Sequence, residues 1–113
     1  MVIDGNVIEI GALNQLKSGT SVLTIKVLHR AYNPTARTFT GQVVYDIELR
    51  KQLAENAHAS LTIGDDVLID ADEHDLVASI YTDSHGQDHP LVSGAKARNI
   101  GLSIRSEALP VTP

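Results

Sequence analysis

The stretch that decides the fold is QLAENAHASLTIGDDVLID, residues 52–70. Leu53, Ala57 and Leu61 recur at four-residue spacing, which is typical of the apolar face of a short helix. Gly64 follows closely and suits the end of such a helix. The residues beyond it return to the two-residue alternation of a strand. This stretch therefore predicts one short helix that leads through a glycine turn into a strand.

Strand patterns lie on both sides of this helix. In SVLTIKVLHRAY, residues 21–32, the apolar side chains of Leu23, Ile25 and Val27 share one face, and polar side chains dominate the other. The same alternation places Val43, Tyr45, Ile47 and Leu49 inward on the next strand, and Val67 and Ile69 inward after the helix. The predicted strand segments are residues 7–13, 21–32, 38–50, 65–71, 76–82 and 91–105.

The order of these elements predicts the fold class. Several short strands separated by turn residues indicate an all-β sandwich or barrel. A single helix between the third and fourth strands favours the five-stranded OB barrel. We expect one OB-fold domain over residues 1–106 and a flexible C-terminal tail over residues 107–113.

Composition excludes several classes of function. The 113 residues contain no cysteine and carry a net charge of −5, and no apolar run is long enough to span a membrane. The N-terminus lacks the basic and apolar regions of a signal peptide, so a cytoplasmic location is expected. No P-loop, nucleophile elbow, zinc-protease motif or dinucleotide loop is present, so we expect neither an enzyme nor a cofactor.

Two groups of acidic and histidine residues were considered as metal sites. One contains His74 within DEHD, and the other contains Asp83, His85 and His89. Imidazole and carboxylate groups do bind divalent metals. Neither spacing matches a ligand motif, however, and polar turns collect Asp and His for other reasons. We expect no metal site.

Four segments of the sequence resemble segments of the bacterial and phage single-stranded DNA-binding (SSB) proteins, and they occur in the same order as in that family. NVIEIGAL, at residues 6–13, is similar to the opening strand of that family. The stretch at residues 52–70 is similar to its helix, glycine turn and strand. YTDSHGQDH, at residues 81–89, is similar to its hairpin, and ARNIGLSIR, at residues 97–105, to its closing strand. The resemblance spans roughly residues 6–105.

This resemblance implies a homotetramer, or a dimer, of OB folds that binds single-stranded DNA in replication, repair and recombination. Bases would stack on aromatic side chains, and phosphates would contact basic ones. The alternatives are that Tyr81 is a half-buried strand residue, that Tyr32 packs on Pro34, and that the basic groups are solvated surface charges.

The apolar face formed by Tyr45, Ile47 and Leu49 suits subunit packing, although Tyr45 also fits the core. The candidate nucleic-acid contacts are Lys26, Arg30, Tyr32, Arg37, Phe39, Arg50, Tyr81 and Lys96, with Arg98 as a further basic candidate.

Departures from the family pattern favour a weak or specialised binder. Val44 and Arg50 fall where the family has two aromatic residues, and Asp46 and Glu48 lie between them on the predicted outer face. Carboxylates there would repel phosphates. The acidic tip with which the family recruits repair and replication proteins is missing from ALPVTP, so no such recruitment is expected. The alternative function is an oligomeric interaction or structural protein that has lost most of its DNA affinity.

Overall fold

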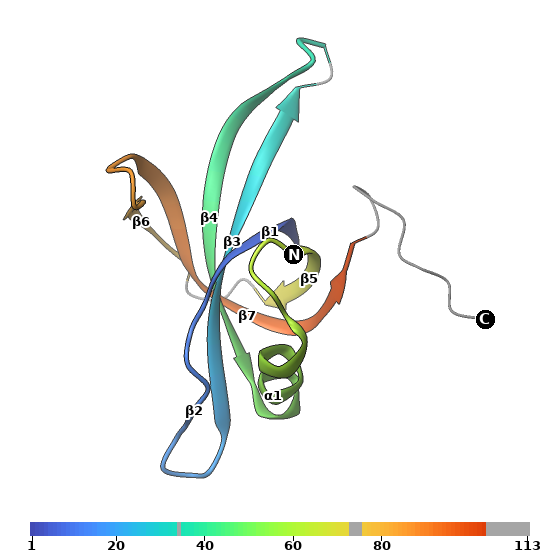
Figure 1. The fold of residues 1–113 in the computed structure, drawn as a ribbon, viewed down its shortest axis with the longest axis vertical. Helices are drawn as coiled ribbons and strands as arrows, with labels where there is room; N and C mark the ends of the chain where they lie inside the picture. Colours follow the sequence, from blue (N-terminus) through green and yellow to red (C-terminus); the bar gives the residue numbers. More distant parts are fainter. Residues whose placement is uncertain (34, 73–75, 104–113) are drawn as a thin grey trace, which may run out of the picture.

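Residues 1–33, 35–72 and 76–103, which the computed structural model describes, form seven strands and one helix (Figure 1). The predicted tail at residues 107–113 and the predicted domain boundary at 106 lie outside these residues. The elements are β1 (Val2–Ile10), β2 (Asn14–Gln15), β3 (Ser21–Asn33), β4 (Thr38–Arg50), α1 (Lys51–Ser60), β5 (Asp66–Asp72), β6 (Val77–Thr82) and β7 (Asp88–Leu102).

Five strands close into a ring in the order β1, β3, β4, β7, β5 and back to β1. The pairing of β4 with β7 is parallel, and the other four pairings of the ring are antiparallel. Along the chain, the helix α1 follows β4 and precedes β5, which are the third and fourth of these five strands in sequence order. The structure thus confirms the predicted five-stranded OB barrel with its single helix. Within the described part of the chain, the short strand β2 pairs with β3 alone, and β6 pairs with β7 alone.

Strand β1 begins earlier than the sequence pattern indicated, at Val2 instead of near Val7. Its first half pairs with β5 and its second half with β3, so that Asn6 is paired on both sides. Gly5 lies at this crossing, where a Cβ atom would overlap the carbonyl oxygen of Leu28. Only glycine allows the two backbones to approach this closely. The missed segment contains Asp4, Gly5 and Asn6, which are poor strand formers, and tertiary pairing overrides that preference.

The core contains most of the residues that alternation placed inward, but Val43 is only half-buried and lies outside the core cluster. Leu23, Ile25 and Val27 of β3 are at most 1% exposed, and Val67 and Ile69 of β5 are fully buried. The helix covers this core with Ala54 and Ala57, which lie on its predicted apolar face. Together these side chains form one continuous cluster inside the ring.

The end of the helix differs from the prediction. The helix stops at Ser60, and Leu61 caps it in an extended conformation by donating its N–H to the carbonyl of Ala57 at 2.8 Å. Gly64, with a φ of 98°, instead forms the turn that enters β5 and donates to the carbonyl of Val7 at 2.7 Å. The glycine therefore joins the helix connection to β1.

Two hairpins extend from the barrel in Figure 1. The β3–β4 hairpin pairs along its length from Val22–Arg50 to Asn33–Thr38, and the part distant from the helix projects away from the ring. The β6–β7 hairpin pairs from Val77–Ser93 to Thr82–Asp88. Among the residues that the structure describes, no helix is long and apolar enough to cross a membrane.

Candidate nucleic-acid interface

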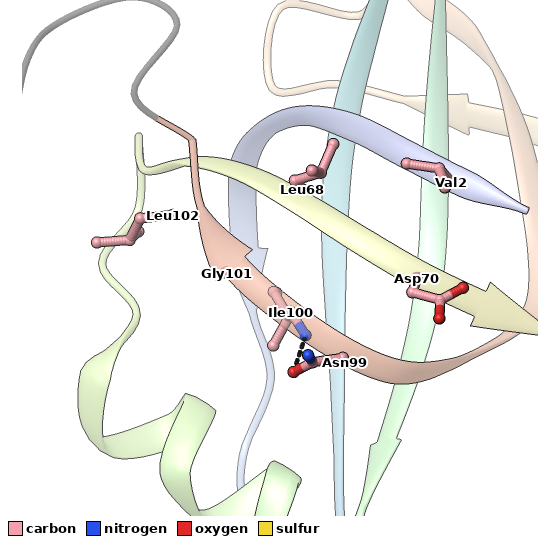
Figure 2. A pocket seen from close by; sticks show the side chains of 7 residues that line it. All are labelled: Val2, Leu68, Asp70, Asn99, Ile100, Gly101 and Leu102. Atoms are coloured by element: carbon pink, nitrogen blue, oxygen red, sulfur yellow. Dashed lines mark hydrogen bonds between the residues drawn. The ribbon is translucent and has the colours of Figure 1, made fainter.

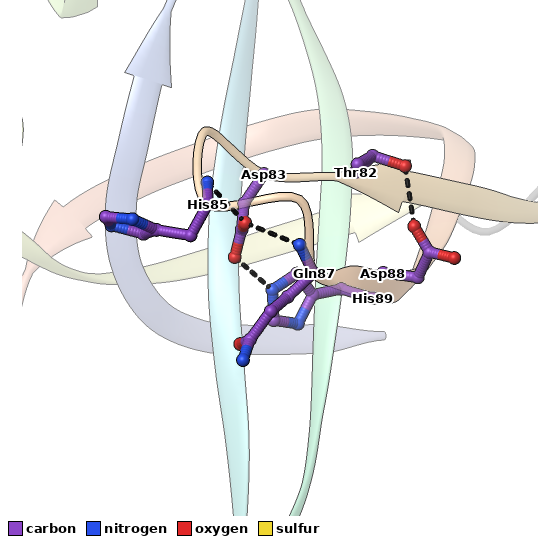
Figure 3. Close-up of polar contacts among 6 residues, drawn as sticks. All are labelled: Thr82, Asp83, His85, Gln87, Asp88 and His89. Carbon is purple, nitrogen blue, oxygen red and sulfur yellow. Dashed lines mark hydrogen bonds and ion pairs between the residues drawn. The ribbon is translucent and has the colours of Figure 1, made fainter.

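The turn of the β6–β7 hairpin is held by Asp83. Its Oδ1 accepts the backbone N–H of His85 at 2.9 Å and that of Gln87 at 3.0 Å, and Gly86 adopts a φ of 78° (Figure 3). Its Oδ2 lies 2.8 Å from Nε2 of His89. The hydrogen bond with His89, followed by that from Gln87, lowers the pKa of the Asp83 carboxyl. Asp83 therefore stays ionised and orders the turn.

Tyr81 and His89 form a pair of rings on one face of this hairpin. They are directly opposed in the β6–β7 register, so both side chains point to the same side. The ring centroids are 6.4 Å apart and the planes are tilted by 31°. Both residues are half-buried. On the other side of the hairpin, Thr82 donates to Asp88 at 2.7 Å.

Lys26 of β3 lies close enough to Tyr81 for the two groups to interact electrostatically. Its Nζ is 3.0 Å from Oε2 of Glu9 and 3.9 Å from Oδ1 of Asp46. Burial lowers the pKa of Lys26, but the hydrogen bond with Glu9 and the charges of Asp46 and Glu9 outweigh it, so the pKa is raised. We call the surface formed by Tyr81, His89, Lys26, Glu9 and Asp46 the Tyr81 face.

Asp46 is the least favourable charge on the Tyr81 face. Burial raises its pKa, the charge of Lys26 opposes this effect, and the charge of Glu9 adds to it. Its Oδ1 has no hydrogen-bond partner among the described residues. Glu9 is therefore the principal partner of Lys26, because it lies at the shorter distance and Asp46 makes no hydrogen bond through Oδ1. Two carboxylates thus flank Lys26, the cation that interacts with Tyr81.

Three further basic candidates lie on β4 and β7. Arg50 is bound to its neighbour Glu48, with 3.0 Å between Nε and Oε2. Lys96 is exposed, and its backbone is in register with Glu48 on one side and Asp72 on the other. Arg98 contacts Asp70 at 3.0 Å and Asp72 at 2.9 Å, and the hydrogen bond with Asp70 is the main cause of its raised pKa.

The other candidates belong to the β3–β4 hairpin. Arg30 is exposed on β3, and Arg37 is exposed in the turn with a φ of 53°. Tyr32 and Phe39 are backbone partners in the register, but their side chains are outside what the structure describes. The structure therefore brings Lys26 to Tyr81 and places Arg30 and Arg37 on the projecting hairpin.

The predicted subunit interface requires a correction. Ile47 and Leu49 have no exposed surface and belong to the core of the barrel, so they are not available to a second subunit. Tyr45 is half-buried against the same core and lies edge-on to His29, with ring centroids 6.4 Å apart. Val44, which alternation placed outward, is also fully buried, although outside the core cluster. Both faces of β4 are therefore buried at this point of the strand.

Exposed apolar surface occurs instead where β1, β5 and β7 lie side by side. Val2 is 69% exposed, Leu68 50% and Leu102 52%. With Asp70 and the segment 99–101 they line an open depression of about 290 Å³ (Figure 2). A second depression of about 280 Å³ continues between β7 and α1.

The considered metal ligands do not form a site in the described part of the chain. No group of three or more His, Asp or Glu side chains is placed there to hold an ion. His85 points away from Asp83 and His89 in Figure 3, so the three residues do not converge. His74 lies outside the described residues.

The class defined by this geometry is an OB barrel with an aromatic and charged outer face. Its fold is similar to the crystal structure of the small single-stranded DNA-binding protein from Streptomyces coelicolor, with a TM-score of 0.62 and 24% sequence identity over 92% of this chain and 93% of that one. The chain thus has an SSB-like OB fold, as its sequence segments indicated. No family model and no curated protein matches the chain.

Sequence reasoning missed His89 and Glu9. His89 was considered only as a metal ligand, although its place opposite Tyr81 follows from a hairpin with its turn at residues 83–87. Glu9 was not considered, because its contact with Lys26 depends on the β1–β3 register. That register shifts between Val7 and Glu9 and is not readable from the sequence pattern.

Proposed function

We propose that this protein binds single-stranded DNA without sequence preference, as a binding protein and not an enzyme. The observation that carries the proposal is the position of Tyr81 on the outer face of an OB barrel, beside His89 and Lys26. OB folds bind single strands by stacking bases on such aromatic side chains above a positively charged groove. The structural similarity to an SSB protein supports the same function.

Phosphate contacts in this proposal come from exposed basic residues on the β3–β4 hairpin and on β7. Arg30 and Arg37 on the projecting hairpin and Lys96 on β7 are all exposed. Lys26 and Arg50 are held by carboxylates, so a phosphate must compete with Glu9, Asp46 or Glu48 for them. The proposed affinity is therefore weaker than that of a typical SSB protein.

Titration of a fluorescent oligo-dT at several salt concentrations tests this function. We expect binding that weakens with salt, with a slope of log K against log salt of about −1.4, because the exposed cations Arg37 and Lys96 each contribute about −0.7 on a single strand. The change in fluorescence anisotropy measures the affinity. Absence of binding even at about 20 mM salt, where phosphate contacts are strongest, would overturn the proposal.

The second candidate function is an oligomeric interaction or structural protein that has lost most of its DNA affinity. The observation in its favour is the pair of half-buried carboxylates of Asp46 and Glu48 on the outer side of β4, together with the net charge of −5. The same titration distinguishes the two functions. An affinity comparable to that of a typical SSB protein would exclude the second candidate, and self-association without any binding supports it.

We also propose self-association as a dimer or tetramer under either function. The exposed side chains of Val2, Leu68 and Leu102 supply apolar surface on β1, β5 and β7. Ile47 and Leu49 are buried in the core and cannot supply it. We expect static light scattering to give a molar mass at least twice the 12.1 kDa of one chain. Leu68→Glu should lower that mass, because a charge placed in a packed apolar interface is unfavourable. A single-chain mass for the native protein at micromolar concentration would contradict self-association.

A further inference from the structure

His89 has the geometry of a ligand-binding residue and not only of a turn residue. Its ring stands opposite Tyr81 on the Tyr81 face, so a single strand of DNA whose base stacks on Tyr81 passes directly beside it. Its side chain is 18% exposed, and the Asp83 side chain that holds it is 24% exposed. The imidazole is therefore fixed in place while part of it remains accessible.

The contact with Asp83 determines which nitrogen of His89 carries the proton in the neutral ring. An ionised carboxylate only accepts hydrogen bonds, so Nε2 must donate to Oδ2 at 2.8 Å. The other nitrogen, Nδ1, is then a bare acceptor that repels a phosphate oxygen. Protonation of the ring converts Nδ1 into a second donor without breaking the bond to Asp83. In Figure 3, Nδ1 is the ring nitrogen that is not bonded to Asp83.

We propose that His89 is a pH-dependent phosphate contact of the Tyr81 face, which strengthens the binding of single-stranded DNA when its ring is protonated. The inference rests on the proposed function and adds its regulation. The phosphate next to the base on Tyr81 accepts the Nδ1–H of the imidazolium, while Asp83 holds the opposite nitrogen.

The other charged groups of the hairpin turn and of the Tyr81 face do not reproduce this behaviour. Asp83 has a lowered pKa and stays ionised throughout the range in which histidine titrates. Lys26 has a raised pKa and stays charged, and it is held by Glu9. Asp46 has a raised pKa, so it is the one neighbour whose loss of negative charge on acidification also favours phosphate binding. The experiment must separate Asp46 from His89.

The test compares oligo-dT affinity at about pH 8 and about pH 6 at constant salt. The native protein should bind about tenfold more tightly at the lower pH, because a hydrogen bond to a charged group adds this much. His89→Phe keeps a ring beside Tyr81, and His89→Gln keeps an N–H donor for Asp83. Both lack the titratable charge, so both should lose the gain. Asp46→Asn should keep it, since the gain originates at His89.

His85→Phe is the matched control. It removes a histidine from the same turn, but its side chain points away from Asp83 and His89 (Figure 3). It should therefore keep the tenfold gain. Equal loss of the gain in His85→Phe and His89→Phe would show a general charge effect and overturn the inference, as would a full gain in both His89 variants. If the native protein binds equally at both pH values, only the inference fails. If it binds at neither, the proposed function fails with it.

Discussion

Gly5→Ala is expected to destabilise the barrel by about 3 kcal/mol, the upper range for overpacking a rigid site. The added methyl group would overlap the carbonyl oxygen of Leu28 and lie 2.9 Å from Cγ1 of Val27. The carbonyl belongs to the backbone of β3 and cannot rotate away as a side chain would. Strands β1 and β3 would have to separate where β1 changes its partner from β5 to β3.

Urea denaturation followed by circular dichroism measures this loss as a lower midpoint. Gly41→Ala is the matched control, because among the described residues nothing lies within 4 Å of a Cβ atom built at Gly41. That variant should stay within about 0.5 kcal/mol of the native protein. Equal midpoints for the two variants would show that β1 and β3 do not approach each other as closely as the structure indicates.

Tyr81→Ala is expected to weaken the binding of oligo-dT by about 1–3 kcal/mol, or roughly 5- to 150-fold, because one base loses its stacking partner. The ring is half-buried against His89 and is outside the core cluster, so the barrel should remain folded. Tyr81→Phe keeps the stacking surface and should bind within a few fold of the native protein. Fluorescence anisotropy at low salt gives each affinity.

Ile80→Ala is the control for this measurement. Ile80 is the neighbouring residue on β6, is 69% exposed and points to the opposite side of the hairpin. Its loss removes apolar surface from the same strand without touching the Tyr81 face, so the affinity should not change. If Ile80→Ala weakens binding and Tyr81→Ala does not, the single-stranded DNA binds to the other side of the hairpin and the Tyr81 face is not the site.

Much of the fold could be predicted because its determinants are local. Strand β4 has the predicted bounds, and β3 ends one residue beyond its predicted end, since alternation and turn residues are properties of neighbouring positions. The turn containing Asp83 and Gly86 was recognised for the same reason. The first half of β1 was missed, because Asp4 and Gly5 are extended only through pairing with β5 and the crossing beside β3.

The candidate site was predicted less completely than the fold. Tyr81 and Lys26 were both identified, but the carboxylate that holds Lys26 most closely is Glu9, which lies on another strand. Alternation correctly placed Ile47 and Leu49 on the apolar, inward face of their strand. They were nevertheless also assigned to a subunit interface, although they fill the core. Periodicity shows that a face is apolar, but it does not show whether this chain or a second one covers it.

The sequence alone determined most of the strands, the presence of the helix and the hairpin turn at Asp83, because each depends on residues a few positions apart. The tertiary structure decided which strands close the ring, which apolar face became the core and which acids pair with which bases. These features depend on the register between distant strands, and a shift of one residue reverses the direction of every side chain. The position of His89 opposite Tyr81, on which the proposed pH dependence rests, follows from that register.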